Sequence, residues 1–440
     1  MSTTSLIFLF LFFIGTILAI VKHPFYGMLT YMLVFYMSPE EAWWSGEIPA
    51  LRWSMLAAAI TLIAILLHPS PPSSRPPWYN TRPAPWLIAF AVWLWIQTPW
   101  ALNLDAHLFL ASLFTKYVLL YAVLYTCLSE PKHIRQFYFA HIIGCFLWGY
   151  LAYENPGSGG RLESLGSGDV AGSAFASMQL GTGIAFAGFA FLGAAGIRRW
   201  LAFSSLPFIL NAIVLMATRA AFVGLLGGVV ASIFFTPKSR RRIVFLALAI
   251  APALLFVLAN DLFWSRMSTI VPDVDTEERD LSAESRILIA KANLQMFLDH
   301  PMGVGHRGNE TLSPQYLSSY LLTVKNGTRV RGAHNTFLAV LVDHGFIGLA
   351  IFLLFQWSIA RSLLWNRYRS SPGLNGEFGL YLAGIATALM IYWGNAQFAN
   401  FTKSEVVIWI AALTSVLEWM AKKPVLECDS IRGETETTQT

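Results

Sequence analysis

The chain has 440 residues, of which 55% are hydrophobic and only 12% are charged. Soluble domains carry about 25% charged residues, so this composition excludes an ordinary soluble domain and predicts an integral membrane protein. The formal net charge of +5 says less than the positions of the basic residues, because those positions set the orientation in a membrane. We expect neither a cofactor nor a nucleic-acid partner.

The three cysteines, Cys127, Cys145 and Cys428, have no spacing typical of a disulfide framework or a zinc site. The N-terminal apolar run Leu6–Val21 has no Lys or Arg before it and no small-residue cleavage pattern after it. A secretory signal peptide has both. We therefore interpret the run as a retained membrane segment.

Apolar runs follow one another along most of the chain, and a helix needs about 20 apolar residues to cross a bilayer. The candidate spans lie at residues 5–21, 25–37, 49–67, 85–101, 106–128, 134–153, 170–195, 200–217, 220–236, 243–260, 335–360, 376–397 and 404–421. The run 25–37 is short, so the expected count is about twelve, with eleven to thirteen allowed. The predicted fold class is an all-α polytopic membrane protein with one large outer loop that contains short helices.

Basic residues gather at alternate ends of successive spans. The clusters are Arg75 and Arg82; Lys132 and Arg135; Arg198 and Arg199; Lys238, Arg240, Arg241 and Arg242; Arg361, Arg367 and Arg369; Lys422 and Lys423. Because basic loops stay in the cytoplasm, the loops 154–169 and 261–333 and the turn Thr218–Arg219 face outward. Taken literally, this places the N-terminus outside with thirteen spans, and twelve spans require the first two runs to merge or re-enter. The expected parts are an N-terminal transmembrane bundle (1–260), the outer loop (261–333), C-terminal transmembrane helices (334–421) and a cytoplasmic tail (422–440).

Four arginines lie on the expected outer side: Arg161, Arg219, Arg266 and Arg286. Arginine carries a planar fork of donors that matches phosphate oxygens, and it stays charged. The alternative for Arg219, which opens an apolar run directly after another, is snorkelling to lipid headgroups. Arg161 sits in a glycine-rich segment that could approach an anion or could be a flexible connector. Arg266 follows Trp264, where an interfacial anchor is the alternative.

The outer loop contains a segment, Leu281–Pro301, with the sequence signals of a helix. Pro301 and Gly303 would stop it. Apolar residues recur at helical spacing and predict one apolar face, made of Ile287, Ala290, Leu294, Phe297 and Leu298. A surface amphipathic helix on the bundle is the simplest interpretation, with Arg286 in its first turn.

His334 lies at the outer mouth of the following span, with Asn335 beside it as a supporting residue. A histidine there can take a proton from a hydroxyl near neutral pH, or it can be purely structural. Asp343 lies deeper in the span, where an ionisable group pairs or lines a polar cavity. Asp343 could also cap a helix break at Gly345.

Several stretches resemble the O-antigen ligase and polymerase superfamily of bacterial envelope glycosyltransferases. They are Ser285–Gly305, His334-Asn-Thr-Phe-Leu338, Asp343-His-Gly-Phe-Ile-Gly348 and Thr218-Arg-Ala220, within a region of about 210–350. The stretches His23–Tyr31 and Met37-Ser-Pro39 resemble the ligase branch associated with exosortase systems. Asp343 and Ala220 depart from the family pattern, which more often has Glu and Gly there.

The resemblance implies a GT-C-like bundle in the bacterial inner membrane with its active site facing the periplasm. It implies catalytic residues His334, Arg286 and Arg219, and a donor diphosphate held by Arg161, Arg219, Arg266 and Arg286. The donor would be a glycan on undecaprenyl diphosphate, and the expected acceptor is a sugar hydroxyl of the lipid A–core oligosaccharide. Direct displacement would invert the anomeric centre.

No cluster of carboxylates resembles a metal site, so we expect metal-independent transfer. Transfer to another glycan (a polymerase) or to a protein hydroxyl (an oligosaccharyltransferase) uses the same donor and stays open. A lipid or glycan transporter is the alternative of another class, although the repeated broken helices typical of transporters are not found.

Overall fold

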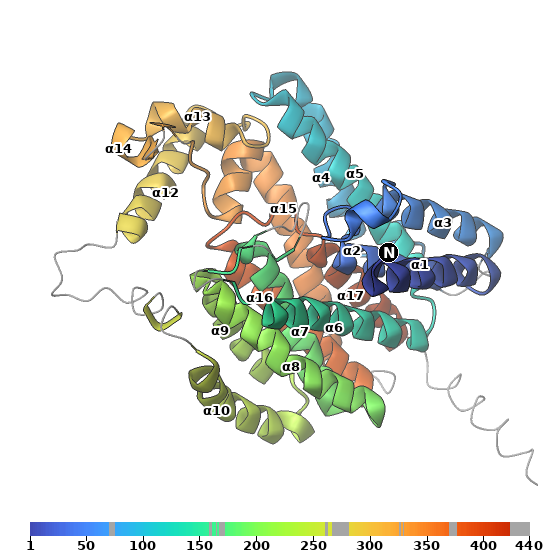
Figure 1. Cartoon of the computed structure of the whole chain (residues 1–440). Helices are drawn as coiled ribbons and strands as arrows, with labels where there is room; N and C mark the ends of the chain where they lie inside the picture. Colours follow the sequence, from blue (N-terminus) through green and yellow to red (C-terminus); the bar gives the residue numbers. More distant parts are fainter. Residues whose placement is uncertain are drawn as a thin grey trace, which may run out of the picture.

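The structure is a computed structural model of the whole chain (Figure 1). It describes residues 1–69, 75–157, 161–163, 165–166, 172–259, 263–265, 281–324, 327–328, 330–368 and 376–422. Within these ranges the secondary structure is helical except for a two-residue antiparallel ladder between β1 (Thr323–Val324) and β2 (Gly327–Thr328). The predicted all-α class is therefore confirmed, apart from this ladder.

The helices follow the predicted apolar runs closely. In the first part of the chain they are α1 (Thr3–Val21), α2 (Phe25–Met37), η1 (Ser45–Glu47), α3 (Trp53–Leu67), η2 (Trp78–Asn80), α4 (Ala84–Gln97), η3 (Thr98–Trp100), α5 (Leu104–Cys127), α6 (Pro131–Glu154), α7 (Ser173–Gly193) and α8 (Ile197–Met216). In the second part they are α9 (Arg219–Phe235), η5 (Lys238–Arg240), α10 (Arg241–Leu258), α12 (Leu281–Asp299), α13 (Gly308–Tyr316), α14 (Ser319–Leu322), α15 (Thr336–Tyr368), α16 (Glu377–Ala396) and α17 (Val406–Lys422).

Six helices in the described ranges are long and apolar enough to cross a membrane: α1, α5, α7, α8, α15 and α16. The count becomes seven if α9 and the helix after it, bent by 118° at their break, form one span. The helices α2 and α3 are apolar but have only 13 and 15 residues. These candidate spans are compatible with the predicted polytopic membrane protein, and the twelve-span GT-C-like arrangement stays a prediction.

The centre of the bundle is built on small residues where α9 packs along α16. A Cβ placed on Gly224 would lie 2.8 Å from the carbonyl oxygen of Ile391, and one on Gly228 would lie 2.6 Å from the Ile391 side chain. One on Gly394 would lie 2.7 Å from the Cα of Gly224. Glycine at such positions lets two helix backbones touch, which is how membrane helices gain packing energy.

The helices α12, α13 and α14 form a separate outer group that stands against α15 (Figure 1). A small apolar cluster joins the group to α15 and includes Ile289 and Met296 of α12, Leu312 of α13 and Val342 of α15. As predicted, α12 ends just before Pro301. The outer group is thus a packed unit of its own on the long helix that follows His334.

The predicted apolar face of α12 was wrong. Ile287, Leu294 and Leu298 are 59%, 51% and 62% exposed, whereas Ile289 and Met296 are 2% and 0% exposed. Apolar residues surround this helix on several sides, so periodicity alone does not decide which stripe is buried. The stripe that meets α13 and Val342 is covered, because those partners supply a complementary apolar surface.

Candidate functional site

His334 is held just outside the N-terminus of α15. The Asn335 side chain caps that helix by accepting the backbone N–H of Leu338 at 3.0 Å, as N-cap asparagines do. The backbone of His334 has φ of +48°, an uncommon conformation for a residue other than glycine. The result is an exposed imidazole on a turn that the following helix fixes.

The connection between α16 and α17 fixes the same turn from the other side. Asn335 donates from Nδ2 to the carbonyl oxygen of Gln397 at 3.2 Å. The Thr336 hydroxyl donates to the carbonyl oxygen of Ala399 at 2.8 Å and accepts the backbone N–H of Phe401 at 2.9 Å. Residues 397–401 therefore hold in place the backbone turn that carries His334. We call these residues the anchor segment.

Arg286 approaches the anchor segment from the outer group. Its guanidinium carbon lies 6.0 Å from the ring centroid of Phe398, and the side chain is half-buried. This distance is at the outer limit for a cation–π contact. The predicted catalytic pair Arg286 and His334 thus both neighbour one five-residue segment.

Arg219 reaches the same end of the bundle from α9, of which it is the first residue. Gly224 packs at Asn395 and Gly228 packs at Thr387, so α9 and α16 run antiparallel. Arg219 comes five residues before Gly224, and this register puts it level with the chain just past the end of α16. That chain is the anchor segment.

Arg161 is fastened beside the start of α9. Its Nε donates to the carbonyl oxygen of Met216 at 2.9 Å, and the guanidinium pairs with Glu163 at 3.1 Å and contacts Ser173. The first turn of α7, which begins at Ser173, also carries Phe175, whose ring lies 4.9 Å from that of Phe401 in the anchor segment. Arg161 therefore belongs to the same end of the bundle, although Glu163 offsets part of its charge.

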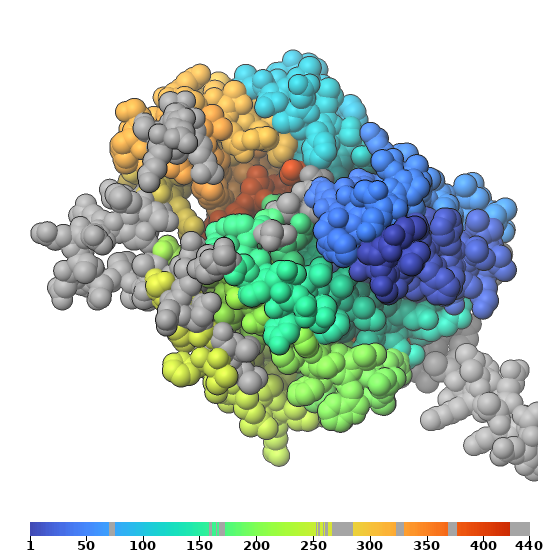
Figure 2. Space-filling model, in the orientation of Figure 1, coloured from blue at the N-terminus to red at the C-terminus, as the bar shows by residue number. Residues whose placement is uncertain are grey.

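Of the four predicted arginines, Arg286 lies beside Phe398 of the anchor segment. Arg219 and Arg161 belong to elements at the same end of the bundle, and Arg266 lies outside the described residues. Figure 2 shows the surface hollowed between the orange outer group and the green helices α7–α9, with the red surface of residues near 400 visible inside.

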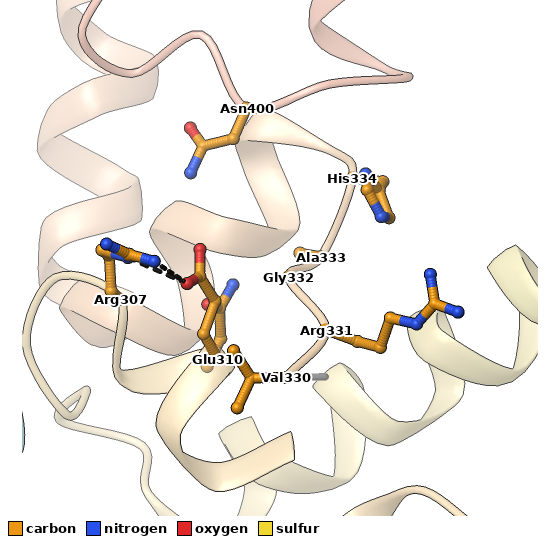
Figure 3. Close-up of a pocket in the computed structure, with 9 residues that line it drawn as sticks. Arg307, Glu310, Val330, Arg331, Gly332, Ala333, His334 and Asn400 are labelled. Carbon is orange, nitrogen blue, oxygen red and sulfur yellow. Dashed lines mark hydrogen bonds and ion pairs between the residues drawn. The ribbon is translucent and has the colours of Figure 1, made fainter. Parts of the chain in front are cut away.

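A cavity of about 320 Å³ lies beside His334 (Figure 3). Its lining residues are Arg307, Asn309, Glu310, Val330, Arg331, Gly332, Ala333, His334 and Asn400. Figure 3 shows Asn400 on one side, Arg307 and Glu310 on another, and the segment with Arg331 and His334 on a third. The Arg307 guanidinium binds Glu310 through two N–H groups, at 2.8 and 2.6 Å. The lining combines apolar and polar groups and includes charges of both signs.

Sequence reasoning missed this cavity. Arg307 and Arg331 carry the same signal as the four selected arginines, a basic residue on the expected outer side, and they could have been selected with them. Nothing in the sequence marks Glu310 or Asn400, because Asn400 reaches the cavity from a segment about 90 residues away along the chain. Such a pairing depends on tertiary structure alone.

Asp343 has a structural role that neither of its predicted alternatives describes fully. Its side chain is 2% exposed. One carboxylate oxygen accepts the backbone N–H of Arg307 at 3.0 Å, and the other accepts that of Asn309 at 2.9 Å. It therefore caps the start of α13 rather than the break at Gly345, and a carboxylate at a helix N-terminus is favoured by the helix dipole.

Comparison with known proteins gives one positive result. No curated protein matches the chain. Residues 204–353 match the family model described as O-Antigen ligase, a region that contains Arg219, Arg286 and His334. The match supports a membrane enzyme that transfers glycans in the manner of a ligase or polymerase. Over this region, about a third of the chain, the sequence is similar to the O-antigen ligase family.

Proposed function

We propose that the chain transfers a glycan from undecaprenyl diphosphate to a sugar hydroxyl of lipid A–core oligosaccharide at the periplasmic face of the inner membrane. The observation that carries this proposal is that Arg286 and the turn carrying His334 both contact the anchor segment, with Arg219 and Arg161 on elements at the same end of the bundle. A diphosphate leaving group and a hydroxyl nucleophile require that combination of fixed cations and one base.

The arginines act on the leaving group. As the bond between the anomeric carbon and the phosphate oxygen breaks, the electron pair stays on the diphosphate. Guanidinium groups already fixed in place stabilise that charge without reorganising, which is the largest single contribution in many enzymes. Arg219 and Arg286 are the main candidates, Arg161 is weakened by Glu163, and Arg266 is retained from the sequence argument. Because these cations supply the charge stabilisation, the proposed step uses no catalytic metal.

His334 acts on the nucleophile. Its exposed imidazole takes the proton of the acceptor hydroxyl as that oxygen bonds to the anomeric carbon. Attack opposite to the departing diphosphate inverts the anomeric centre, and undecaprenyl diphosphate is released. The cavity beside His334 is large enough for a sugar, and Asn309, Glu310 and Asn400 offer acceptors and donors for its hydroxyl groups. We assign this cavity to the acceptor.

The test uses purified full-length protein with lipid-linked glycan and, in separate reactions, lipid A–core, a second lipid-linked glycan and a Ser/Thr-containing acceptor protein. Product with lipid A–core alone supports the ligase assignment. Product with the second or third acceptor assigns a polymerase or an oligosaccharyltransferase. Movement of the glycan across proteoliposomes, with no covalent product, would assign a transporter and refute the proposal. Activity that stops on chelation and returns only with Mg²⁺ or Mn²⁺ would refute metal-independent chemistry.

Two variants test the residue roles. His334→Ala should lower transfer by about 10²- to 10⁴-fold, as expected for a general base, while donor binding stays intact. The matched control is His300→Ala, which changes a half-buried histidine of the outer region that does not line the cavity. Full activity in His334→Ala rejects the role of the base.

For the donor cations, Arg219→Lys keeps the charge but loses the planar fork, so it should weaken donor binding and slow transfer. Arg199→Ala is the control, because Arg199 lies near the start of α8 and Arg219 follows the end of α8, a helix of 20 residues and roughly 30 Å. Equal effects of the two substitutions would contradict a specific diphosphate site.

A further inference from the structure

A buried group of three side chains lies where the connection between α12 and α13 crosses α15. His306, Asp343 and His344 each offer one metal-ligand atom, and these atoms all lie within 4.8 Å of one another. The three residues are 4%, 2% and 1% exposed. Two imidazoles and a carboxylate are expensive to bury unless each finds a partner, and they line no part of the cavity beside His334.

The backbone holds this group together. Gly303 and Gly345 both have positive φ, +81° and +69°. A Cβ on Gly303 would lie 2.7 Å from the carbonyl oxygen of Asp343, and one on Gly345 would lie 2.5 Å from that of Pro301. The N–H of Gly305 donates to the carbonyl oxygen of Asp343 at 2.7 Å. The two segments that carry the three side chains, the connection before α13 and the kink of α15, are therefore in backbone contact. These backbone contacts set their relative position without a bound ion.

Hydrogen bonding around Gln97 determines where the proton of His344 sits. The Gln97 amide nitrogen donates to the carbonyl oxygens of Asp343 at 2.7 Å and Met302 at 3.4 Å. The amide oxygen is left to face Nδ1 of His344 at 2.8 Å, so Nδ1 carries the proton and Nε2 keeps a lone pair. Metal-binding histidines are typically oriented in this way by a hydrogen bond from the other ring nitrogen.

Each oxygen of Asp343 accepts a backbone N–H group at the start of α13. Nδ1 of His306 lies 3.7 Å from Oδ2 of Asp343, too far for a hydrogen bond. Two ligands about 2.1 Å from one tetrahedral ion are roughly 3.4 Å apart. The separation thus fits ligands that share an ion better than a direct contact.

His107 completes the surroundings without being a ligand. Its Nδ1 accepts the backbone N–H of His306 at 3.1 Å, and its Nε2 faces the carbonyl oxygen of Leu94 at 2.8 Å. Both of its nitrogens are therefore used, and the backbone of His306 is tied to α5. The ring nitrogens of His306 and His344 that face Asp343 make no hydrogen bond of this kind within the described residues. A cation between them would bind both imidazoles and the Asp343 carboxylate.

We propose that His306, Asp343 and His344 bind one divalent transition-metal ion, with Zn²⁺ as the favoured ion for two imidazoles and one carboxylate. The ligand atoms lie within 4.8 Å of one another, so the imidazoles need to rotate inward by no more than about 1 Å when the ion binds. The ion fastens the outer group to α15. Asp343 lies seven residues after Thr336, roughly 10 Å along the helix, so the ion supports the site and takes no part in transfer.

The test measures metal directly in full-length protein purified in detergent, with a tag free of histidine and without chelators. Elemental analysis should find about one zinc ion per chain, and Co²⁺ should replace it and give the visible absorption of a tetrahedral site. His306→Ala should remove both signals. His300→Ala, a histidine six residues earlier, should keep them. Gln97→Leu keeps all three ligands and removes the orienting bond, so it should weaken metal affinity about 10- to 100-fold.

Chelation of the wild-type protein should lower its melting temperature and should leave His306→Ala unchanged. Wild-type protein without metal that also gives no Co²⁺ absorption would overturn the proposal, whatever the variants do. The same holds if His306→Ala binds as much zinc as the wild type. If His306→Ala does not fold, the affinity of Gln97→Leu decides, and an affinity equal to that of the wild type rejects the site. None of these readouts depends on glycan transfer.

Discussion

Gly224→Ala is the sharpest test of how α9 positions Arg219. The added methyl group would lie 2.8 Å from the carbonyl oxygen of Ile391, whereas ordinary contact begins at 3.4 Å. The obstacle is backbone, so α9 must move from α16 by at least 0.6 Å, the difference between the two distances. Overpacking of this kind costs about 1–3 kcal/mol, and the better helix propensity of alanine returns about 1 kcal/mol.

The effect on transfer should exceed the effect on stability. Arg219 lies on the first turn of the displaced helix, and a misplacement of about 1 Å can lower a rate about 100-fold. We expect a fall of about 10- to 100-fold in the rate of transfer of labelled glycan. The melting temperature, followed by tryptophan fluorescence in detergent, should fall by only a few degrees.

Two other glycines provide controls. Gly227→Ala, on the same helix, would bring its methyl group 3.3 Å from the carbonyl oxygen of Met390, close to ordinary contact. Gly188→Ala, on α7, would meet nothing within 4 Å and should stabilise the helix by about 0.5–1 kcal/mol. If Gly224→Ala transfers glycan as fast as Gly227→Ala, the packing of α9 on α16 does not position a catalytic residue, and the reasoning is refuted.

Three further substitutions test the elements around His334. Gly345→Ala places a side chain on a backbone with φ of +69° and ψ of −173° and against Pro301. It should lower the free energy of unfolding by about 1–3 kcal/mol. An unchanged melting temperature would contradict the helix kink at this residue. Thr336→Val removes the hydroxyl that accepts the Phe401 N–H and leaves that N–H buried without a partner, which should cost about 1–3 kcal/mol of stability. The rate of transfer should fall by more than this loss of stability explains. A lower melting temperature with an unchanged rate would argue against the role of the anchor segment. Asp343→Asn replaces one of the two carboxylate oxygens that accept backbone N–H groups by an NH₂ donor, which should lower the free energy of unfolding by about 2 kcal/mol. Amide hydrogen exchange at the start of α13 should become faster. Unchanged exchange would contradict the capping role.

The residues that start and stop helices explain what could be predicted from the sequence. Pro301 stops α12, and Thr218 separates α8 from α9, because each change of direction has its cause in adjacent residues. The turn before α15 was also predictable, since Asn335 is a strong N-cap residue. These signals placed Arg219 and His334 at element ends, which is where the structure has them. Arg286, predicted in the first turn, is instead the sixth residue of α12.

Other features depend on contacts that no local pattern contains. The predicted span 85–101 became the 14-residue helix α4, because Gln97 ends it and turns its amide to the carbonyl oxygens of Met302 and Asp343, some 200 residues later in the chain. A count of apolar residues treats Gln97 as a minor interruption of a span. Only the folded connection between α12 and α13 gives that amide its partners.

The site is assembled from elements that pack mainly on different neighbours. Arg219 belongs to the α9–α16 pair and Arg286 to the outer group on α15, so neither fixes the other directly. The anchor segment provides the link, through Phe398 to Arg286 and through Ala399 and Phe401 to Thr336. It lies beyond the family match, which ends at residue 353. The matched region therefore contains the three residues proposed to be catalytic, and the contacts that connect Arg286 with the turn before α15 come from a segment outside it.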